Sequence, residues 1–275
     1  MLVAAALVPD TALLVPGAAG AADVLGDLRT AALDAVRAVA DTAPSVVVVA
    51  PGRRGRTLTG RVRASLGVVG VPEGLLGWPV PERRAEPVRG VRADRSTPST
   101  GTAVALHLLA QAGWDGALSV LETGPDEPMS SAGYTAPAPG DHGGDAAAPG
   151  RPGDRWRRVG AGLGAGRDVG LVVVGSGSGR HGPDGPLADD ARAPVHDARL
   201  VEDLSHAGPA ARARLAADDP VLAAELAVTG WAPWQVLVGA ADEAAAGGAD
   251  VDGRLLAAGT PYGAQHLVAM WTVTR

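Results

Sequence analysis

The order strand, helix, buried strand within the first 51 residues constrains the fold most strongly. Residues 2–8, LVAAALV, are an apolar run that ends at Pro9. Residues 21–41 then repeat apolar side chains at helical spacing, with Asp and Arg on the opposite side. Residues 45–51, SVVVVAP, are typical of a strand covered on both faces. This order predicts an α/β fold with a mostly parallel sheet flanked by helices.

Similar patterns continue along the chain, with helices predicted at 102–112, 156–166 and in pieces over 188–245, and strands at 116–122, 168–175 and 265–275. Residues 124–154 are rich in Gly, Pro, Ala and Asp and show no periodicity, which predicts a flexible insertion. Because no internal repeat interrupts the pattern, we expect one domain spanning 1–275.

Composition excludes several classes of function. The net charge is −6 with both signs interspersed, so no basic stripe favours nucleic acid. The absence of Cys excludes disulfides, thiolate nucleophiles and Cys-ligated metals. No uninterrupted apolar stretch approaches the ~20 residues of a membrane span. Asp10 and two prolines interrupt the apolar N-terminus, which therefore indicates the first strand of a cytoplasmic domain, not a signal peptide.

Two glycine-rich segments resemble phosphate-binding motifs incompletely. Gly177-x-Gly179-x-x-Gly182 has the spacing of a dinucleotide fingerprint, but Pro183 and Pro186 oppose the helix that would bind the pyrophosphate. Residues 50–57, APGRRGRT, lack one glycine and the lysine of a P-loop. The tract GSGSG at 175–179 is also out of phase with the G-x-S-x-G of serine hydrolases. We interpret these segments as loops that follow buried strands.

None of the six histidines has a metal-binding spacing such as HxH or HExxH. Two of them lie at the ends of predicted strands, where α/β proteins gather functional side chains. His181 follows the strand at 168–175, and His266 begins the strand at 265–275. These two histidines are therefore the candidates that the pattern favours.

Several phrases together resemble the class III extradiol ring-cleavage dioxygenases, namely the family of their B-like subunits and in particular a divergent Ala-rich bacterial branch. They are VPDTALLVP (8–16), VVVVAPG (46–52), LVVVGSGSGR (171–180), APWQVLVGAA (232–241) and TPYGAQHLVAMW (260–271). Residues 53–160 match poorly. The resemblance implies an α/β fold with a cleft at the carboxyl ends of the strands and, in active members, a non-haem iron centre.

The chain departs from the family at its iron-binding positions. The resemblance places Asp10 and Gly52 where active members have histidine ligands, and Gly179 where they have an acid/base histidine. The C-terminal segment offers no carboxylate in the family's position. Asp203-Leu204-Ser205-His206 reads D-L-S-H literally, but it lies inside the helical region and belongs to another element. The resemblance therefore implies the fold without the usual ligands.

Three hypotheses about function stay open. The first is a non-catalytic or repurposed member that holds a small polar or anionic ligand in the old cleft and needs no cofactor. The second is a ring-cleavage oxidoreductase that binds Fe(II) through relocated ligands. The third is a structural homo-oligomer, or a partner of a small subunit. Candidate ligand-binding residues are Asp10, Arg53, Ser178, Arg180, Tyr262 and His266; candidate catalytic residues are Arg180 and His181; relocated metal ligands would be Asp10, His181 and His266.

Overall fold

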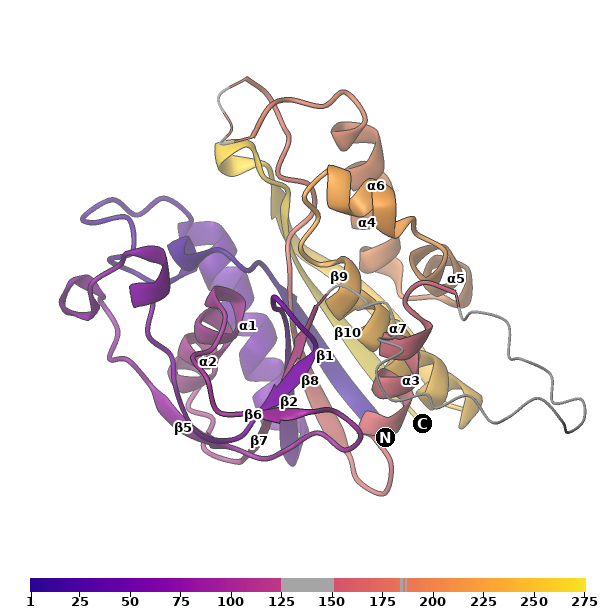
Figure 1. The fold of residues 1–275 in the computed structure, drawn as a ribbon. Coiled ribbons are helices and arrows are strands. Elements are labelled where there is room, and N and C mark those ends of the chain that lie inside the picture. The colour runs from indigo at the N-terminus through magenta and orange to yellow at the C-terminus, as the bar shows by residue number, and fades with distance from the viewer. Residues whose placement is uncertain (125–150, 184, 186) are drawn as a thin grey trace, which may run out of the picture.

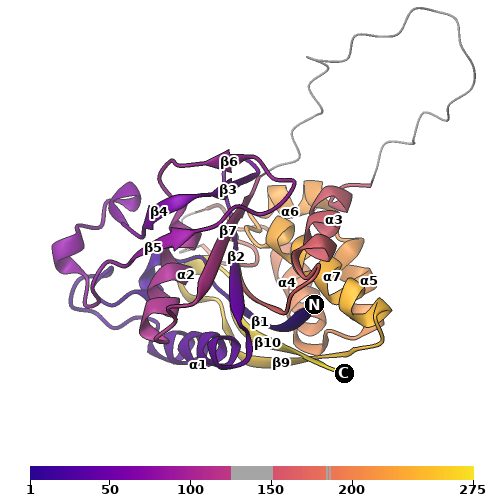
Figure 2. The same cartoon turned by 90° about the horizontal axis from the view of Figure 1, so that it is seen from below.

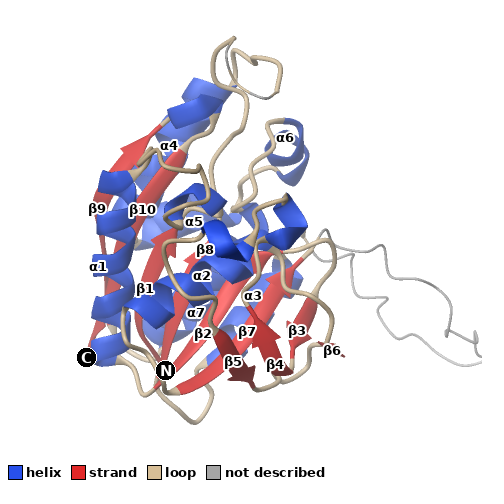
Figure 3. Cartoon of the chain, turned by 90° about the vertical axis from the view of Figure 1, so that its left-hand side faces the viewer, coloured by secondary structure: helices blue, strands red, loops and turns tan. Residues whose placement is uncertain are grey.

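The computed structural model describes residues 1–124, 151–183, 185 and 187–275. Its centre is an eight-stranded sheet in the order β6-β3-β7-β2-β8-β1-β10-β9 (Figures 1 and 3). Its strands are β1 (Leu2–Val8), β2 (Ser45–Pro51), β3 (Arg56–Leu58), β6 (Ala93–Asp94), β7 (Ala117–Thr123), β8 (Val169–Val174), β9 (Asp250–Gly259) and β10 (His266–Thr274). A separate pair, β4 (Gly60–Arg63) and β5 (Glu82–Ala85), lies beside the sheet.

The sheet is mixed, with a parallel centre. Strands β1, β8, β2 and β7 are parallel neighbours, as the sequence predicts. Towards one edge β10 and β9 run antiparallel, and towards the other β3 pairs antiparallel with β7 before β6 pairs parallel with β3. The expectation of a mostly parallel sheet therefore holds for the centre and is corrected at both sides.

Helices cover both faces of the sheet, so the domain has three layers (Figures 1 and 2). One face carries α1 (Gly26–Thr42) and α2 (Thr100–Gln111). The other carries α3 (Asp154–Leu163), α4 (Ala193–His206), α5 (Pro209–Ala216), α6 (Pro220–Glu225) and α7 (Trp231–Ala246). Short 3-10 turns lie at Ala12–Leu14, Gly67–Val69, Glu73–Leu75 and Pro261–Gly263. No helix in the described part of the chain is long and apolar enough to cross a membrane.

Strand β2 contributes side chains to the hydrophobic cores on both faces of the sheet. Its side chains alternate between the faces, so Val46 and Val48 pack in the core beneath α1 and α2. Val47 and Val49 pack in the core of the opposite face. All four are 0–1% exposed, and each fully buried Val contributes about 1.5 kcal/mol or more. This two-sided burial explains why the strand reads as a continuous apolar run.

Most sequence-predicted elements are confirmed, including the strands at 2–8, 45–51 and 168–175 and the helices over 188–245. Two regions differ from the prediction. Strand β9 is not predicted by its sequence, and residues 53–99 contain short strands and 3-10 turns. The predicted insertion at 124–154 lies, over residues 125–150, outside the described residues, and Asp154 already begins α3.

Candidate functional site

Sheet register brings three polar residues together at the carboxyl edge of the parallel strands. Val8 pairs with Val174 at the ends of β1 and β8, and Asp10 and Ser176 lie two residues beyond these strand ends. Leu7 pairs with Ala269 in the antiparallel β1–β10 register, and three residues further lie Asp10 and His266. Three distant segments thus meet at one point, in the place where open α/β sheets bind ligands.

These three residues form a hydrogen-bonded chain, which we call the relay. The Ser176 hydroxyl lies 2.6 Å from Asp10 Oδ1 and 2.9 Å from His266 Nδ1. Ser176 and His266 are buried, at 4% and 5% exposure, and Asp10 is half-buried. Burial lowers the pKa of His266, and the negative charge of Asp10 opposes this shift only in part. The imidazole is therefore neutral at pH 7.

A second polar cluster lies two residues further along the loop, around Asp197 of α4. Its Oδ1 accepts a hydrogen bond from the Ser178 backbone N–H (3.0 Å), and its Oδ2 lies 2.5 Å from His181 Nε2. His196 lies 3.7 Å from Asp197 and 3.1 Å from Asp218. Burial opposes the ionisation of Asp197, but hydrogen bonds from His196, His181 and Ser178 hold its pKa below the usual range. The carboxylates of Asp197 and Asp218 raise the pKa of His196 to about 9.

Glycine is required in the loop that joins the two clusters. A Cβ on Gly177 would lie 2.8 Å from Asp197 Oδ1 and 2.9 Å from the Gln265 Cβ. The same loop pairs with residue 265 through two backbone hydrogen bonds of 2.8 Å, from Gly177 N and to Ser178 O. The glycine therefore permits close backbone approach. The N–H groups of Gly177, Ser178 and Gly179 donate to Gln265 O, Asp197 Oδ1 and Leu226 O, so they are not available to bind a phosphate.

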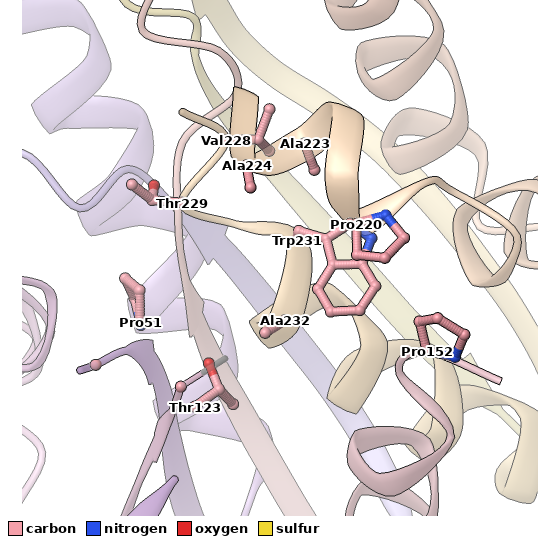
Figure 4. A pocket seen from close by; sticks show the side chains of 12 residues that line it. Pro51, Thr123, Pro152, Pro220, Ala223, Ala224, Val228, Thr229, Trp231 and Ala232 are labelled. Atoms are coloured by element: carbon pink, nitrogen blue, oxygen red, sulfur yellow. The ribbon is translucent and has the colours of Figure 1, made fainter. Parts of the chain in front are cut away.

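A pocket of about 610 Å³ opens beside the relay (Figure 4). Thr229 connects the two, because its hydroxyl accepts a 2.8 Å hydrogen bond from Ser176 N and its side chain lines the pocket. Pro51 also lines the pocket, and both Pro51 and Asp10 lie beside Gly101, whereas none of the three relay residues lines the pocket itself. The lining is mainly apolar and comprises Pro51, Gly52, Thr123, Gly124, Pro152, Pro220, Ala223, Ala224, Val228, Thr229, Trp231 and Ala232.

Four predicted ligand-binding residues do not contribute as expected. The sequence predicts an anion on Arg180, but its guanidinium donates to the carbonyl oxygens of Glu225 (2.6 Å) and Ala188 (3.1 Å). Arg53 lines a different cavity, of about 850 Å³, together with two further arginines. Tyr262 is 58% exposed on a turn at the edge of the molecule. Ser178 is fully buried and contacts Asp197 through its backbone N–H.

The proposed relocated iron ligands do not come together. His181 pairs with Asp197, whereas Asp10 and His266 both contact Ser176. Over the described ranges no group of three or more His, Asp or Glu side chains could hold a metal ion. The set Asp10, His181 and His266 is therefore corrected to two separate hydrogen-bonded groups.

The side-chain carboxylate of Glu122 contacts the P-loop-like segment 50–57. After Gly55 the chain enters β3, not a helix. Glu122 accepts hydrogen bonds from the Ser99 N–H (2.6 Å) and the Thr102 hydroxyl (2.9 Å) at the start of α2, and from Arg56. An anion thus does lie at a helix N-terminus here, and it is a buried side chain.

Sequence reasoning missed Ser176, Asp197 and Thr229. Ser176 stands in the same tract as the predicted Ser178, and only the strand register distinguishes the two. Asp197 lies one turn into α4, where an acidic residue on a helix carries no signal of its own. Nothing in the sequence distinguishes Thr229 from the helical segments around it, because its hydrogen bond is made with Ser176, 53 residues away.

No family model matches the chain, and no curated protein does. The crystal structure of the uncharacterized protein JW3007 from Escherichia coli K12 is similar, with a TM-score of 0.51 and 12% sequence identity. The similarity covers 98% of this chain and 99% of that chain. At this identity it shows a shared α/β fold across the whole chain and nothing about activity.

Proposed function

We propose that this protein is a repurposed relative of the B-like subunits of extradiol dioxygenases, and that it binds a small organic molecule in the cleft at the carboxyl edge of its sheet. The observation that carries the proposal is the pocket of about 610 Å³ beside the relay of Asp10, Ser176 and His266. A concave, largely apolar pocket with a few convergent polar groups is the usual form of a small-molecule site.

The lining points to a mainly apolar ligand. Trp231 and Val228 offer apolar surface (Figure 4). The Thr123 and Thr229 hydroxyls already donate to the carbonyl oxygens of Ala50 and Ser176, so they can only accept from a ligand. Because the guanidinium of Arg180 is bound to backbone carbonyls and Arg53 lines another cavity, neither supports an anion in this pocket. We therefore favour a neutral ligand with one or two polar groups over the anionic ligand expected from the sequence.

The two other hypotheses receive no support from the geometry of the site. Ring cleavage with relocated iron ligands would need His181 beside Asp10 and His266, and these side chains belong to separate groups. Assembly into a homo-oligomer, or with a small partner subunit, stays a prediction.

A fragment screen by thermal unfolding tests the proposal. A compound bound at 100 times its Kd stabilises the folded state by about 2.7 kcal/mol, which raises the Tm by roughly 5 °C. Ala224 is exposed on α6 and lines the pocket, so Ala224→Trp should fill it and abolish the shift. Ala246→Trp, at the exposed end of α7, is the matched control and should keep it. Hits that survive Ala224→Trp unchanged, or an absence of hits, would contradict the proposal.

A further inference from the structure

A second concave site lies between α3 and the loop 87–90 that joins β5 to β6. Its volume is about 580 Å³, and it shares no lining residue with the pocket beside the relay. Its apolar lining includes Val88, Val159 and Leu163, which also pack on the hydrophobic core of this face. No acidic residue is among the described residues that line it. Its charged lining consists of Arg89, Arg155, Arg158 and Arg167, and we call this site the arginine groove.

The four arginines of the arginine groove have no carboxylate partner in the described ranges of the chain. All four are exposed, and none of them takes part in an ion pair with a described residue. The acidic residues nearest to them in the sequence are engaged elsewhere or point away. Asp154 pairs with Arg157, and Asp168 pairs with the N-terminal ammonium group. Glu86, which precedes the loop, is exposed and does not line the groove. The positive charge of the groove is therefore uncompensated.

Two of these arginines are held on a rigid helix. Arg155 and Arg158 are three residues apart on α3 and so lie on one face, where like charges destabilise a helix unless an anion lies beside them. The Arg155 guanidinium stacks over the ring of the fully buried Trp156, 4.8 Å from its centroid. Close contact at Gly160 and Gly239 fixes α3 against α7. The guanidinium groups thus start from a fixed backbone, which lowers the cost of ordering them around a ligand.

We propose that the arginine groove binds a small organic molecule that carries two adjacent anionic groups, such as a diphosphate ester with an apolar body. Guanidinium groups present planar forks of N–H donors that match phosphate oxygens bidentately. The apolar lining would cover the organic part, and the volume lies in the range of small-molecule sites. This site is separate from the one in the proposed function, and the inference does not depend on that function.

A compact anion fits this groove better than a nucleic acid does. The four charges gather in one concavity and form no extended stripe, while the whole chain carries a net charge of −6. A long phosphate backbone would therefore meet repulsion outside the groove.

Calorimetry on the whole chain with three related probes tests the ligand class. Geranyl diphosphate has both the anionic and the apolar part, pyrophosphate has only the first, and geraniol has only the second. We expect geranyl diphosphate to bind about tenfold tighter than pyrophosphate, because its chain covers apolar lining, and geraniol not to bind measurably. Equal affinities of geranyl diphosphate and geraniol would overturn the inference. So would tighter binding of a single-stranded oligonucleotide than of geranyl diphosphate.

Variants show whether binding takes place in the arginine groove. Arg158→Glu should weaken the binding of geranyl diphosphate at least about tenfold. Arg199→Glu is the matched control, because Arg199 is exposed on α4, changes the net charge equally and does not line the groove. Ala165→Trp keeps every charge and fills the groove from an exposed position, so it should weaken geranyl diphosphate more than pyrophosphate. Equal losses in Arg158→Glu and Arg199→Glu would show general attraction of anions and would overturn the assigned site.

Discussion

Glu122 and Arg56 form an ion pair in which the carboxylate is fully buried at the start of α2. Arg56 Nε and Nη2 lie 2.7 and 2.6 Å from Glu122 Oε2, and the arginine side chain is 12% exposed. Asp94 contacts the same guanidinium at 3.4 Å. The pair joins β3 to β7 and to the N-terminus of α2.

Removing this carboxylate should destabilise the fold. Glu122→Ala leaves the Arg56 charge and the Ser99 N–H without their partner, and we expect a loss of about 3–5 kcal/mol in the free energy of unfolding, measured in urea. Glu82→Ala is the control, because its 3.3 Å pair with Arg61 is exposed and should contribute about 0–1 kcal/mol. Similar losses in the two variants would show that burial of the pair is immaterial.

Helices α3 and α7 pack so closely at Gly160 and Gly239 that neither position should tolerate a larger side chain. A Cβ on Gly160 would lie 2.0 Å from the Val236 carbonyl oxygen, and a Cβ on Gly239 would lie 2.0 Å from that of Arg157. We expect Gly160→Ala to lower the melting temperature through a loss of about 1–3 kcal/mol. Gly162→Ala on the same helix meets nothing within 4 Å, so it should be neutral or stabilising by up to about 1 kcal/mol. Equal effects of the two changes would refute the close contact.

His196 should make stability fall as the pH rises above neutrality. Its pKa is about 9 in the folded state because of Asp197 and Asp218, and about 6.5 when unfolded. Between these two pH values the folded state therefore binds more protons than the unfolded state. The stabilisation that His196 contributes is complete below about pH 6.5 and is lost as the pH passes about 9. We expect the free energy of unfolding to fall by on the order of 2–3 kcal/mol across this pH window.

Urea unfolding at pH 6, 7.5 and 9.5 measures this dependence. His196→Gln should flatten it, whereas the exposed His206→Gln should retain the wild-type slope. An unchanged slope in His196→Gln would show that the histidine is not the titrating group.

Local patterns predict the parallel centre of the sheet well, because strands such as β2 are buried on both faces and leave an unmistakable apolar run. Strand β9 escapes prediction since its burial pattern is irregular, with most of its residues exposed or half-buried at the sheet edge. Likewise His266 can be singled out as a strand-end residue, whereas its connection to Asp10 through Ser176 depends on registers between segments 90 and 166 residues apart.

The most direct test of a ligand site in the pocket beside the relay is a crystal structure of the protein grown with a saturating concentration of the best hit from the fragment screen. We expect the molecule in the pocket bounded by Pro51, Thr229 and Trp231. Density for the compound only outside this pocket, or an empty pocket at saturation, would contradict the claim that the carboxyl edge of the sheet is a ligand site.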